Sequence, residues 1–415
     1  MKAVSMVFDS RISILTGKPG TGKTTTVKAI LDRADKEELT IIQAAPTGKA
    51  AKRMIESTGR YASTIHSALV AMIDNGDFSF MINENNPFQV DLIIIDEASM
   101  ITTDLFRHLL AGIDTKKTRL LMVGDTGQLP SVGGGAVLRD LIDSGIIPHT
   151  ELDIIHRNSG KIVEACAAVH AGKTFSKENR IDLESENKIN LIHVDCADQE
   201  TILSAIETVV SERMPIRGYD PVWDVQVISP VNTRGVLSCD SINTKLRERL
   251  NTEPAVDEKS KFKPGDKVIN TRNLKALVHR RAEEVVVVNG DIGKVVYVTD
   301  KKLIIDFYDP DRTVEIDKSK NSLLHAYCIT CHRFQGSEAP VIIIPVHSSF
   351  AFFANRSWIY TAISRAREIC ITIGDFSAIE SMVRNTRDTR RVTMLREKIL
   401  NEYQSRQLML KYGGI

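Results

Sequence analysis

The sequence has few cysteines, no long apolar run and almost no net charge. Six cysteines in 415 residues are too sparse for a disulfide scaffold, and we expect reduced and mostly buried thiols. No apolar stretch reaches the roughly 18 to 20 residues of a membrane span, and residues 1–15 lack the pattern of a signal peptide. These absences predict a cytoplasmic protein with no membrane partner.

The charge balance limits how the chain can bind nucleic acid. Lys and Arg number 54 against 53 Asp and Glu, a formal net charge of +1, so nucleic acid would have to bind in a local channel rather than through an overall basic field. With 42% hydrophobic and 26% charged residues, the composition is that of a globular protein. Because a single core stops growing at roughly 250 to 300 residues, we expect two or more domains.

Short β-branched runs alternate with helical patterns, which is the signature of an α/β fold with buried parallel strands. The first set predicts strands at residues 11–16, 40–44, 91–95 and 120–123. A second set begins later in the chain and is completed near its end, at residues 225–229, 341–346 and 370–374. Two α/β domains are therefore predicted.

Two segments depart from this pattern. Residues 262–322 break into short strands separated by turns such as Asn-Gly-Asp at 289–291, which predicts a small all-β insertion. Residues 68–89 contain Asp-Asn-Gly-Asp at 74–77, a sequence that can turn a β-hairpin. Each predicted α/β domain is thus interrupted once.

Residues 17–24 read G-K-P-G-T-G-K-T, a phosphate loop placed between a predicted strand and a predicted helix. Its glycines allow backbone N–H groups to surround phosphates at the start of the helix. Lys23 is expected to reach the β- and γ-phosphates, and the Thr24 hydroxyl to ligate Mg²⁺. The segment predicts nucleotide binding.

An acidic pair, Asp96-Glu97, follows the apolar run at residues 92–95. Its position at the carboxyl end of a buried strand is where open α/β sheets bind ligands. We expect Asp96 to hold Mg²⁺ and Glu97 to polarise the attacking water; such a pair can also simply begin a helix.

A third strand ends in the loop that contains Gln128. From there, the amide can sense the γ-phosphate and orient water. In the alternative interpretation, Gln128 is only a solvated turn residue.

Taken in order, nine further segments together with the phosphate loop resemble the RecD-like helicases of superfamily 1, the branch that moves 5′ to 3′. They are residues 45–51, 62–66, 96–100, 124–133, 151–157, 262–268, 289–293, 326–338 and 360–366. The resemblance covers nearly the whole chain and implies two RecA-like domains. It places the first at residues 1–170, with a hairpin insertion at 68–89, and the second at 171–415, with an SH3-like insertion at about 262–322.

The resemblance also implies an ATP-dependent DNA helicase that uses ATP and Mg²⁺, with ATP bound between the domains. The residues implied in catalysis are Lys23, Glu97, Gln128, Arg157 and Arg365. An arginine from the second domain would neutralise the charge that builds on the γ-phosphate and tie hydrolysis to closure. The implied ATP contacts are Gly17, Pro19, Gly20, Thr21, Gly22, Lys23, Thr24, Thr25, Gln128, Arg157, Gly336, Glu338 and Arg365, and the implied magnesium ligands are Thr24 and Asp96.

By the same resemblance a strand of DNA crosses both domains. The implied contacts suit sugar and phosphate recognition and are Pro46, Thr47, Lys49, Thr64, His66, Thr330, His332 and Gln335. His66 is equally a capping or packed histidine. In relatives the hairpin splits the duplex and the barrel helps to hold the strand; here Phe78 or Phe80 either stacks on the end base pair or packs the hairpin down.

The expected partners are single-stranded DNA and single-strand–duplex junctions, with a single-stranded-DNA-binding protein or recombination and replication proteins as further candidates, and the chain is expected to be a monomer. Two departures from the family pattern stand out. Residues 1–16 contain no glutamine, whereas relatives recognise adenine with one before the phosphate loop, so either the start is truncated or base selectivity is relaxed. Lys18 stands where the family usually has glycine.

Three rival functions remain at this stage. Residues 328–332 read C-I-T-C-H, the pattern of covalent haem attachment, and the cysteine pair also suggests zinc, but both overlap a helicase segment and lack further ligands. An ATP-binding subunit without hydrolysis is a second alternative. A motor on RNA is the third, and no residue type distinguishes it from a DNA motor.

Overall fold

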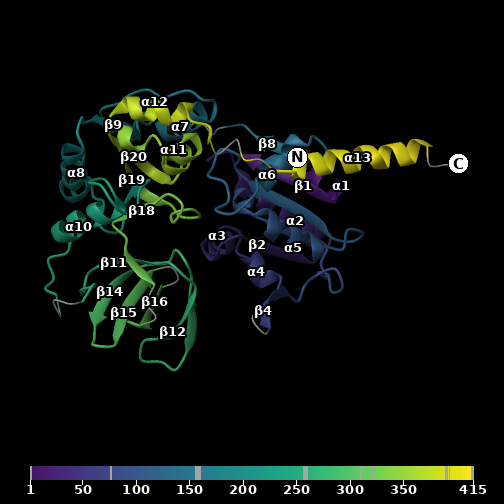
Figure 1. Cartoon of the computed structure of the whole chain (residues 1–415), viewed down its shortest axis with the longest axis horizontal. Helices are drawn as coiled ribbons and strands as arrows, with labels where there is room; N and C mark the ends of the chain where they lie inside the picture. The colour runs from purple at the N-terminus through teal and green to yellow at the C-terminus, as the bar shows by residue number, and fades with distance from the viewer. Residues whose placement is uncertain are drawn as a thin grey trace. The chain divides into compact units, whose positions relative to one another are not determined.

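The computed structural model describes residues 2–74, 77–154, 160–255, 260–308, 311–319, 322–387, 391 and 393–412. The chain forms two compact units (Figure 1). Unit 1 combines Met1–His156 with Thr386–Ile415, and unit 2 is Arg157–Asn385. Among the described residues, no helix has the length and apolar character needed to cross a membrane.

Unit 1 is built on a six-stranded parallel sheet in the order β3-β2-β6-β7-β1-β8. The strands predicted in the first half of the sequence are all present. Two short strands, β3 and β8, have too few apolar residues to be recognised in sequence. The strands are β1 (Ile12–Gly17), β2 (Ile41–Ala45), β3 (Ser63–Thr64), β6 (Leu92–Ile95), β7 (Arg119–Gly124) and β8 (His149–Leu152).

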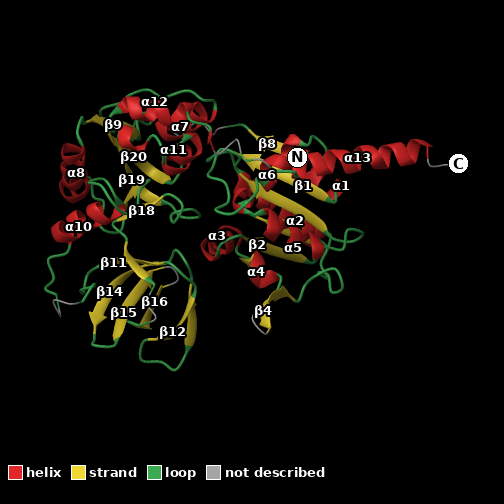
Figure 2. Cartoon of the chain, viewed as in Figure 1, coloured by secondary structure: helices red, strands yellow, loops and turns green. Residues whose placement is uncertain are grey.

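Helices cover both faces of this sheet, which is why its strands are apolar throughout (Figure 2). In β6, Leu92 and Ile94 pack on one face against α1 and α2, whereas Ile93 and Ile95 pack on the other against α5 and α6. The helices are α1 (Lys2–Asp9), α2 (Lys23–Lys36), α3 (Gly48–Thr58), α4 (Ile65–Ala68), η1 (Ala98–Met100), α5 (Thr103–Ala111), α6 (Val137–Asp143) and α13 (Leu395–Tyr412).

A two-stranded antiparallel hairpin, β4 (Ala71–Asp74) and β5 (Asp77–Phe80), interrupts unit 1 between α4 and β6. Its position matches the hairpin predicted at residues 68–89. The predicted turn at residues 75 and 76 lies outside the described residues.

Unit 2 contains a five-stranded parallel sheet in the order β18-β10-β19-β20-β9. Its strands are β9 (Leu191–Asp195), β10 (Val225–Ser229), β18 (Cys328–Thr330), β19 (Ala339–Val346) and β20 (Ala366–Gly374). The helices around it are α7 (Gly160–His170), α8 (Gln199–Thr208), η2 (Val209–Arg213), α9 (Met214–Ile216), α10 (Cys239–Leu250), η3 (Ser348–Phe350), α11 (Arg356–Ile363) and α12 (Phe376–Arg384).

A separate seven-stranded antiparallel sheet lies between β10 and β18 in sequence. Its order is β13-β12-β16-β15-β14-β11-β17, and it encloses its own apolar core. Figure 2 shows this part of unit 2 as strands and loops. The strands are β11 (Lys267–Asn270), β12 (Leu274–Val278), β13 (Glu284–Val287), β14 (Ile292–Val298), β15 (Lys302–Tyr308), β16 (Asp311–Asp317) and β17 (Leu323–His325).

The antiparallel sheet is fastened to the rest of unit 2 at Asp266. This buried carboxylate accepts hydrogen bonds from Arg247 Nε and Asn251 Nδ2, both at 2.8 Å, and from the Lys263 backbone N–H at 2.9 Å. The His325 ring lies 3.3 Å away. Burial opposes ionisation of Asp266, but the bonds from His325, Arg247, Lys263 and Asn251 outweigh it and lower its pKa to about 2.

The units differ from the expected domains 1–170 and 171–415. Helix α7 packs against α11 and so belongs to unit 2. The C-terminal segment packs on α6 of unit 1: Leu395 and Ile399 join its core, and Thr393 donates to Asp140 at 2.7 Å. Beyond these contacts α13 (yellow in Figure 1) is exposed and mostly polar over residues 401–407. The small apolar contact explains why its sequence did not show where it packs.

Candidate nucleotide site and nucleic-acid track

The phosphate loop, residues 17–24, joins the end of β1 to the first turn of α2. Gly20 and Gly22 have φ angles of 76° and 84°, in the left-handed region that favours glycine. A Cβ atom at Gly17 would lie 2.5 Å from Thr21 Oγ1. The N-cap residue of α2 is Gly22, which has no side chain to accept from the first turn, so backbone N–H groups there can donate to an anion.

Lys23 folds over this loop. Its ammonium group donates to the carbonyl oxygen of Gly17 and, at 3.1 Å, to that of Lys18. Thr24 and Thr25, in the same helical turn, are exposed. The structure therefore gathers on one loop all the predicted nucleotide contacts of this segment: Gly17, Pro19, Gly20, Thr21, Gly22, Lys23, Thr24 and Thr25.

Asp96 and Glu97 follow directly on β6. The Asp96 carboxylate accepts from the Glu97 backbone N–H at 2.8 Å. Desolvation and the neighbouring Glu97 charge raise the pKa of Asp96 above its usual range. Glu97 has a φ of 51°, a strained conformation for a residue with a side chain and one that concentrates at functional sites.

Gln128 is held in place by Asp125, a residue that sequence reasoning did not single out. Asp125 is buried and accepts from the Gly127 N–H at 2.9 Å, and its other oxygen lies 3.5 Å from Gln128 Nε2. The preceding Gly124 has no room for a side chain, because a Cβ atom would lie 2.7 Å from Leu138 Cδ2. The amide of Gln128 is therefore oriented rather than freely solvated.

These three segments converge because β6, β7 and β1 are adjacent parallel strands. Lys23 and Arg53 both lie close enough to Asp96 to favour its charged form. Arg53, on α3, belongs to no motif singled out in the sequence. The edge formed by the carboxyl ends of these strands thus brings together a phosphate-binding loop, two carboxylates, an amide and two cations.

A residue from the far end of the chain supports the loop after Gln128. Arg391 donates to the carbonyl oxygens of Gly133 and Gly135 at 2.9 and 3.1 Å, and to the Ser131 hydroxyl at 3.4 Å. Nothing in the local sequence around Arg391 indicates this contact, since its partners lie more than 250 residues earlier.

In unit 2, Arg365 is 3% exposed at the end of α11. Its guanidinium donates to the Ser337 carbonyl oxygen at 3.4 Å and to the Ser364 hydroxyl at 3.3 Å. Gly336, with a φ of 72°, lies on the loop that contains Ser337, and the neighbouring Glu338 is exposed. The other predicted arginine, Arg157, lies outside the described residues.

The predicted DNA contacts of unit 1 lie side by side. Strands β2 and β3 pair in parallel, with Ala45 opposite Thr64, so the segments that follow them share one edge. The hydroxyls of Thr47 and Thr64 cap α3 and α4 by accepting from backbone N–H groups at 3.2 and 3.1 Å. Pro46 and Lys49 flank Thr47, half-buried.

His66 is exposed on α4, and its ring centroid lies 6.0 Å from that of Phe80. Burial and the neighbouring His108 lower the pKa of His66. Phe80 itself is 7% exposed, belongs to the core of unit 1, and has its ring 4.8 Å from that of His108. For Phe80 the packing interpretation is confirmed; the side chain of Phe78 lies outside the described residues.

The predicted DNA contacts of unit 2 are mostly enclosed. Thr330 and Gln335 are each 6% exposed, whereas His332 is exposed. Cys328 and Cys331 are buried beside them, with the Cys328 sulfur 3.8 Å from that of Cys239. Desolvation raises the pKa of the Cys331 thiol to about 12. Burial of both thiols leaves no surface for haem attachment, and within the described part of the chain no cluster of three or more His, Cys, Asp or Glu side chains would complete a zinc site.

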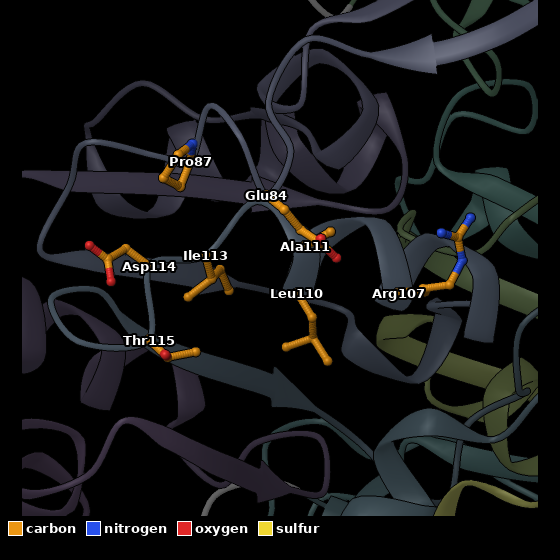
Figure 3. A pocket seen from close by; sticks show the side chains of 8 residues that line it. All are labelled: Glu84, Pro87, Arg107, Leu110, Ala111, Ile113, Asp114 and Thr115. Atoms are coloured by element: carbon orange, nitrogen blue, oxygen red, sulfur yellow. The ribbon is translucent and has the colours of Figure 1, made fainter.

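A cavity of about 580 Å³ lies elsewhere in unit 1 (Figure 3). Its lining comes from α5 and from the loops that lead into β6 and β7, which places it at the amino edge of the sheet, opposite the phosphate loop. It is distinct from the nucleotide site. The lining residues are Glu84, Pro87, Arg107, Leu110, Ala111, Ile113, Asp114 and Thr115.

Comparison with known proteins places both units. Residues 1–192 match the AAA domain family and residues 325–373 the UvrD-like helicase C-terminal domain. The Pif1 helicases of Bacteroides, solved with ADP-AlF3 and single-stranded DNA, and of Candida albicans align with TM-scores of 0.50 and 0.52 at 18% and 16% identity. The alignments cover 98% and 97% of this chain, and 97% and 98% of those chains. At such identities the likeness shows a shared fold of two RecA-like domains.

Relatives in sequence are closer. The ATP-dependent RecD2 DNA helicase of Deinococcus radiodurans is 31% identical over 390 residues, which are 93% of this chain and 50% of that protein. The RecBCD enzyme subunit RecD of Mycolicibacterium smegmatis is 27% identical over 434 residues, which are 96% of this chain and 74% of that protein. The chain spans about half the length of the first relative. These matches extend over both units and support the resemblance to the RecD-like helicases that the order of the sequence motifs indicates.

Proposed function

We propose that the chain is an ATP-dependent DNA helicase that moves 5′ to 3′ on single-stranded DNA and unwinds duplex. The observation that carries this proposal is the convergence of the phosphate loop, Asp96, Glu97 and Gln128 at one edge of a parallel sheet. Such an edge binds and hydrolyses nucleotide. The sequence relationship to a helicase named as ATP-dependent supports the same activity.

In unit 1, Lys23 would leave the loop carbonyls to contact the β- and γ-phosphates. Glu97 would polarise the attacking water, and Gln128, oriented by Asp125, would position it.

A magnesium ion fits the residues present. Thr24 and Asp96 offer the hydroxyl and carboxylate oxygens that hard cations prefer. Desolvation, and after it the neighbouring Glu97 charge, raise the pKa of Asp96, and a bound cation would offset both. When bound, magnesium would neutralise phosphate charge and order the β- and γ-oxygens. The described residues contain no cluster of three or more His, Cys, Asp or Glu side chains that would favour another metal.

In unit 2, Arg365 and Arg157 would supply positive charge to the γ-phosphate, with Gly336 and Glu338 near the nucleotide. Arrival of an arginine from a second unit makes hydrolysis depend on closure. Because Arg365 is buried against Ser337 and Ser364, its guanidinium must swing out to act.

The strand would run over Pro46, Thr47, Lys49, Thr64 and His66 in unit 1. In unit 2 it would run over Thr330, His332 and Gln335. The helix-capping hydroxyls and exposed imidazoles suit contacts to phosphate and sugar, which position a strand without reading its sequence. The hairpin β4–β5 would separate the duplex, and the antiparallel sheet around β11–β17, as an SH3-like barrel, would help to hold the strand. Junctions and single-stranded DNA are the proposed partners of a monomeric motor, with strand-binding and recombination proteins as candidates.

The first test replaces Lys23 by Ala and measures DNA-stimulated ATP hydrolysis. We expect a loss of at least about 100-fold, because the phosphate charge then lacks its ammonium partner. Lys28→Ala, an exposed lysine on the same helix, is the matched control and should retain activity. Equal activity of the two variants would overturn the nucleotide site.

The second test uses duplexes with either a 5′ or a 3′ single-stranded overhang, of DNA and of RNA. Unwinding only from the 5′ DNA overhang is expected. Unwinding from the 3′ overhang alone would refute the direction, and stimulation by RNA alone would change the track. Comparing ATP with GTP, CTP and UTP tests whether a site without the usual N-terminal glutamine still selects adenine.

A further inference from the structure

Arg365 is a buried cation held only by neutral groups. Of the five N–H donors of a guanidinium, two meet oxygen acceptors, the Ser337 carbonyl at 3.4 Å and the Ser364 hydroxyl at 3.3 Å, and Nε–H is buried without an acceptor. Within the part of the chain that the structure describes, no carboxylate forms an ion pair with it. A buried charge with such partners is under-compensated, so an anion would be a better partner than its present ones.

The hydroxyl that holds the guanidinium is itself fixed. Ser364 is the C-cap residue of α11 and is 6% exposed. Its hydroxyl donates to the Thr361 carbonyl oxygen at 2.9 Å, which leaves its lone pairs free to accept from Arg365. We call the Ser364 hydroxyl the latch. The end of α11 therefore holds the latch in a position from which it can accept from Arg365.

The second acceptor, the Ser337 carbonyl, is linked to the proposed DNA track by backbone hydrogen bonds within one loop. The Phe334 N–H donates to the Thr330 carbonyl at 3.1 Å, and the Ser337 N–H donates to the Phe334 carbonyl at 3.0 Å. The Ser337 carbonyl then accepts from Arg365. Three consecutive hydrogen bonds join Thr330 to the guanidinium, through a loop that also presents His332 at the surface.

We propose that residues 330–337 form a relay that couples strand binding to release of Arg365, and that Ser364 is the positioning residue that holds the arginine retracted until then. This inference rests on the proposed function and adds a regulatory step to it. A strand that engages His332 shifts the loop, lengthens the already long bond from Arg365 to Ser337, and leaves the guanidinium to the nucleotide phosphate. Without a strand, both bonds keep the arginine away and hydrolysis stays slow.

Removing the latch should separate basal from stimulated activity. In Ser364→Ala, Arg365 loses its one side-chain acceptor among the described residues. We expect DNA-free ATP hydrolysis to rise roughly tenfold, the scale of a hydrogen bond to a charged group. The rate with saturating single-stranded DNA should change little, so the fold-stimulation falls by about the same factor. Ser364→Thr keeps the hydroxyl and should restore the wild-type ratio.

Ser144→Ala is the matched control. Ser144 is also a buried helix C-cap residue whose hydroxyl donates to the carbonyl three residues earlier, at 2.6 Å, but it contacts no arginine. Its loss should leave the ratio of stimulated to basal hydrolysis unchanged. Urea unfolding of all variants checks that each is folded.

The outcomes distinguish the relay from the proposed function. If wild-type hydrolysis ignores DNA, or if Arg365→Ala hydrolyses as wild type does, the proposed function fails. If Arg365→Ala is inactive and Ser364→Ala keeps the wild-type ratio, or loses basal and stimulated rates in parallel, the relay is wrong while the function stands. A raised basal rate that Ser364→Thr does not reverse also contradicts it.

Discussion

The two units carry incompletely compensated charges of opposite sign. Unit 1 places Asp96 and Glu97 side by side, where desolvation and mutual repulsion raise the pKa of Asp96. Unit 2 buries Arg365 against neutral oxygens. Each arrangement is costly by itself, and each would be relieved by a magnesium nucleotide that brings a cation to the carboxylates and phosphate oxygens to the arginine.

Two other buried charges in unit 2 do not carry the energetic cost of a missing ionic partner. Both have strong partners: Asp266 accepts four hydrogen bonds or close contacts, and Arg312 lies 2.6 Å from Asp291. The buried Lys267, in contrast, donates to the Val225 carbonyl oxygen at 3.2 Å. Arg365 differs from Asp266 and Arg312, because its hydrogen bonds within the described part of the chain are to a carbonyl and a hydroxyl at 3.4 and 3.3 Å. Where a fold pairs its structural charges well, a poorly paired one marks a place where stability has been given up for function.

The largest effect should come from removing the arginine charge while keeping its bulk. Arg365→Met should lower kcat for DNA-stimulated ATP hydrolysis by about 10³-fold, because transition-state charge on the γ-phosphate then has no guanidinium partner. Steady-state kinetics and nucleotide titration measure it, with binding expected to stay within a few fold. A loss of kcat below tenfold would show that hydrolysis does not depend on the Arg365 charge.

Removing a well-paired buried charge should instead affect stability. Asp266→Asn leaves Arg247 and His325 without their carboxylate, and we expect it to lower the free energy of unfolding by about 3 kcal/mol. Urea denaturation reports this value, and Asp300→Asn, an exposed turn residue in the same sheet, should change it little. Equal stability of the two variants would mean that Asp266 is as poorly compensated as Arg365.

The acid dependence of that effect follows from the pKa. Asp266 titrates near 2 when folded and near 3.8 when unfolded, so its contribution of about 2 kcal/mol is complete above pH 5 and is lost as the pH falls toward 2. The stability gap between wild type and Asp266→Asn should therefore narrow by about 1 kcal/mol at pH 3, roughly a third of its value at neutral pH. A gap that stays constant from pH 5 to pH 3 would contradict the assigned pKa.

The smallest predicted effect is on the stability of an Arg365 variant, and it tests directly whether this buried charge is under-compensated. Arg365→Met should raise the free energy of unfolding by about 1 kcal/mol, since an under-compensated buried charge is replaced by an apolar side chain of similar length. The same variant would thus be more stable and nearly inactive. Destabilisation would show that the neutral hydrogen bonds suffice to hold the charge.

The sequence predicted the features that depend on short stretches of chain, namely the buried strands and the phosphate loop. The apolar runs at residues 92–95 and 120–123 specify buried strands, and the phosphate loop requires glycines that no other residue replaces. Once the strands are parallel, their carboxyl ends must share an edge, so the grouping of Lys23, Asp96 and Gln128 follows from sequence. Their relative distances do not, because these depend on packing.

Contacts between distant segments were the ones that sequence could not predict. Arg391 reaches Gly133, and Asp266 meets His325 across 59 residues, although neither pair has a local pattern. Phe80 seemed as suited to the hairpin tip as to its base, and only the register of β4 and β5, with Ala71 opposite Phe80, places it in the core. The retracted position of Arg365 depends on a rotamer, which no sequence pattern records.

The return of the chain to unit 1 has a consequence during synthesis. Unit 2 is one continuous stretch, whereas unit 1 needs Leu395 and Ile399 to cover part of its core. At roughly 5 to 20 residues per second, the ribosome finishes the whole of unit 2 before these residues emerge. Unit 1 begins first and is completed last, with the apolar side of α6 open for on the order of ten seconds or more.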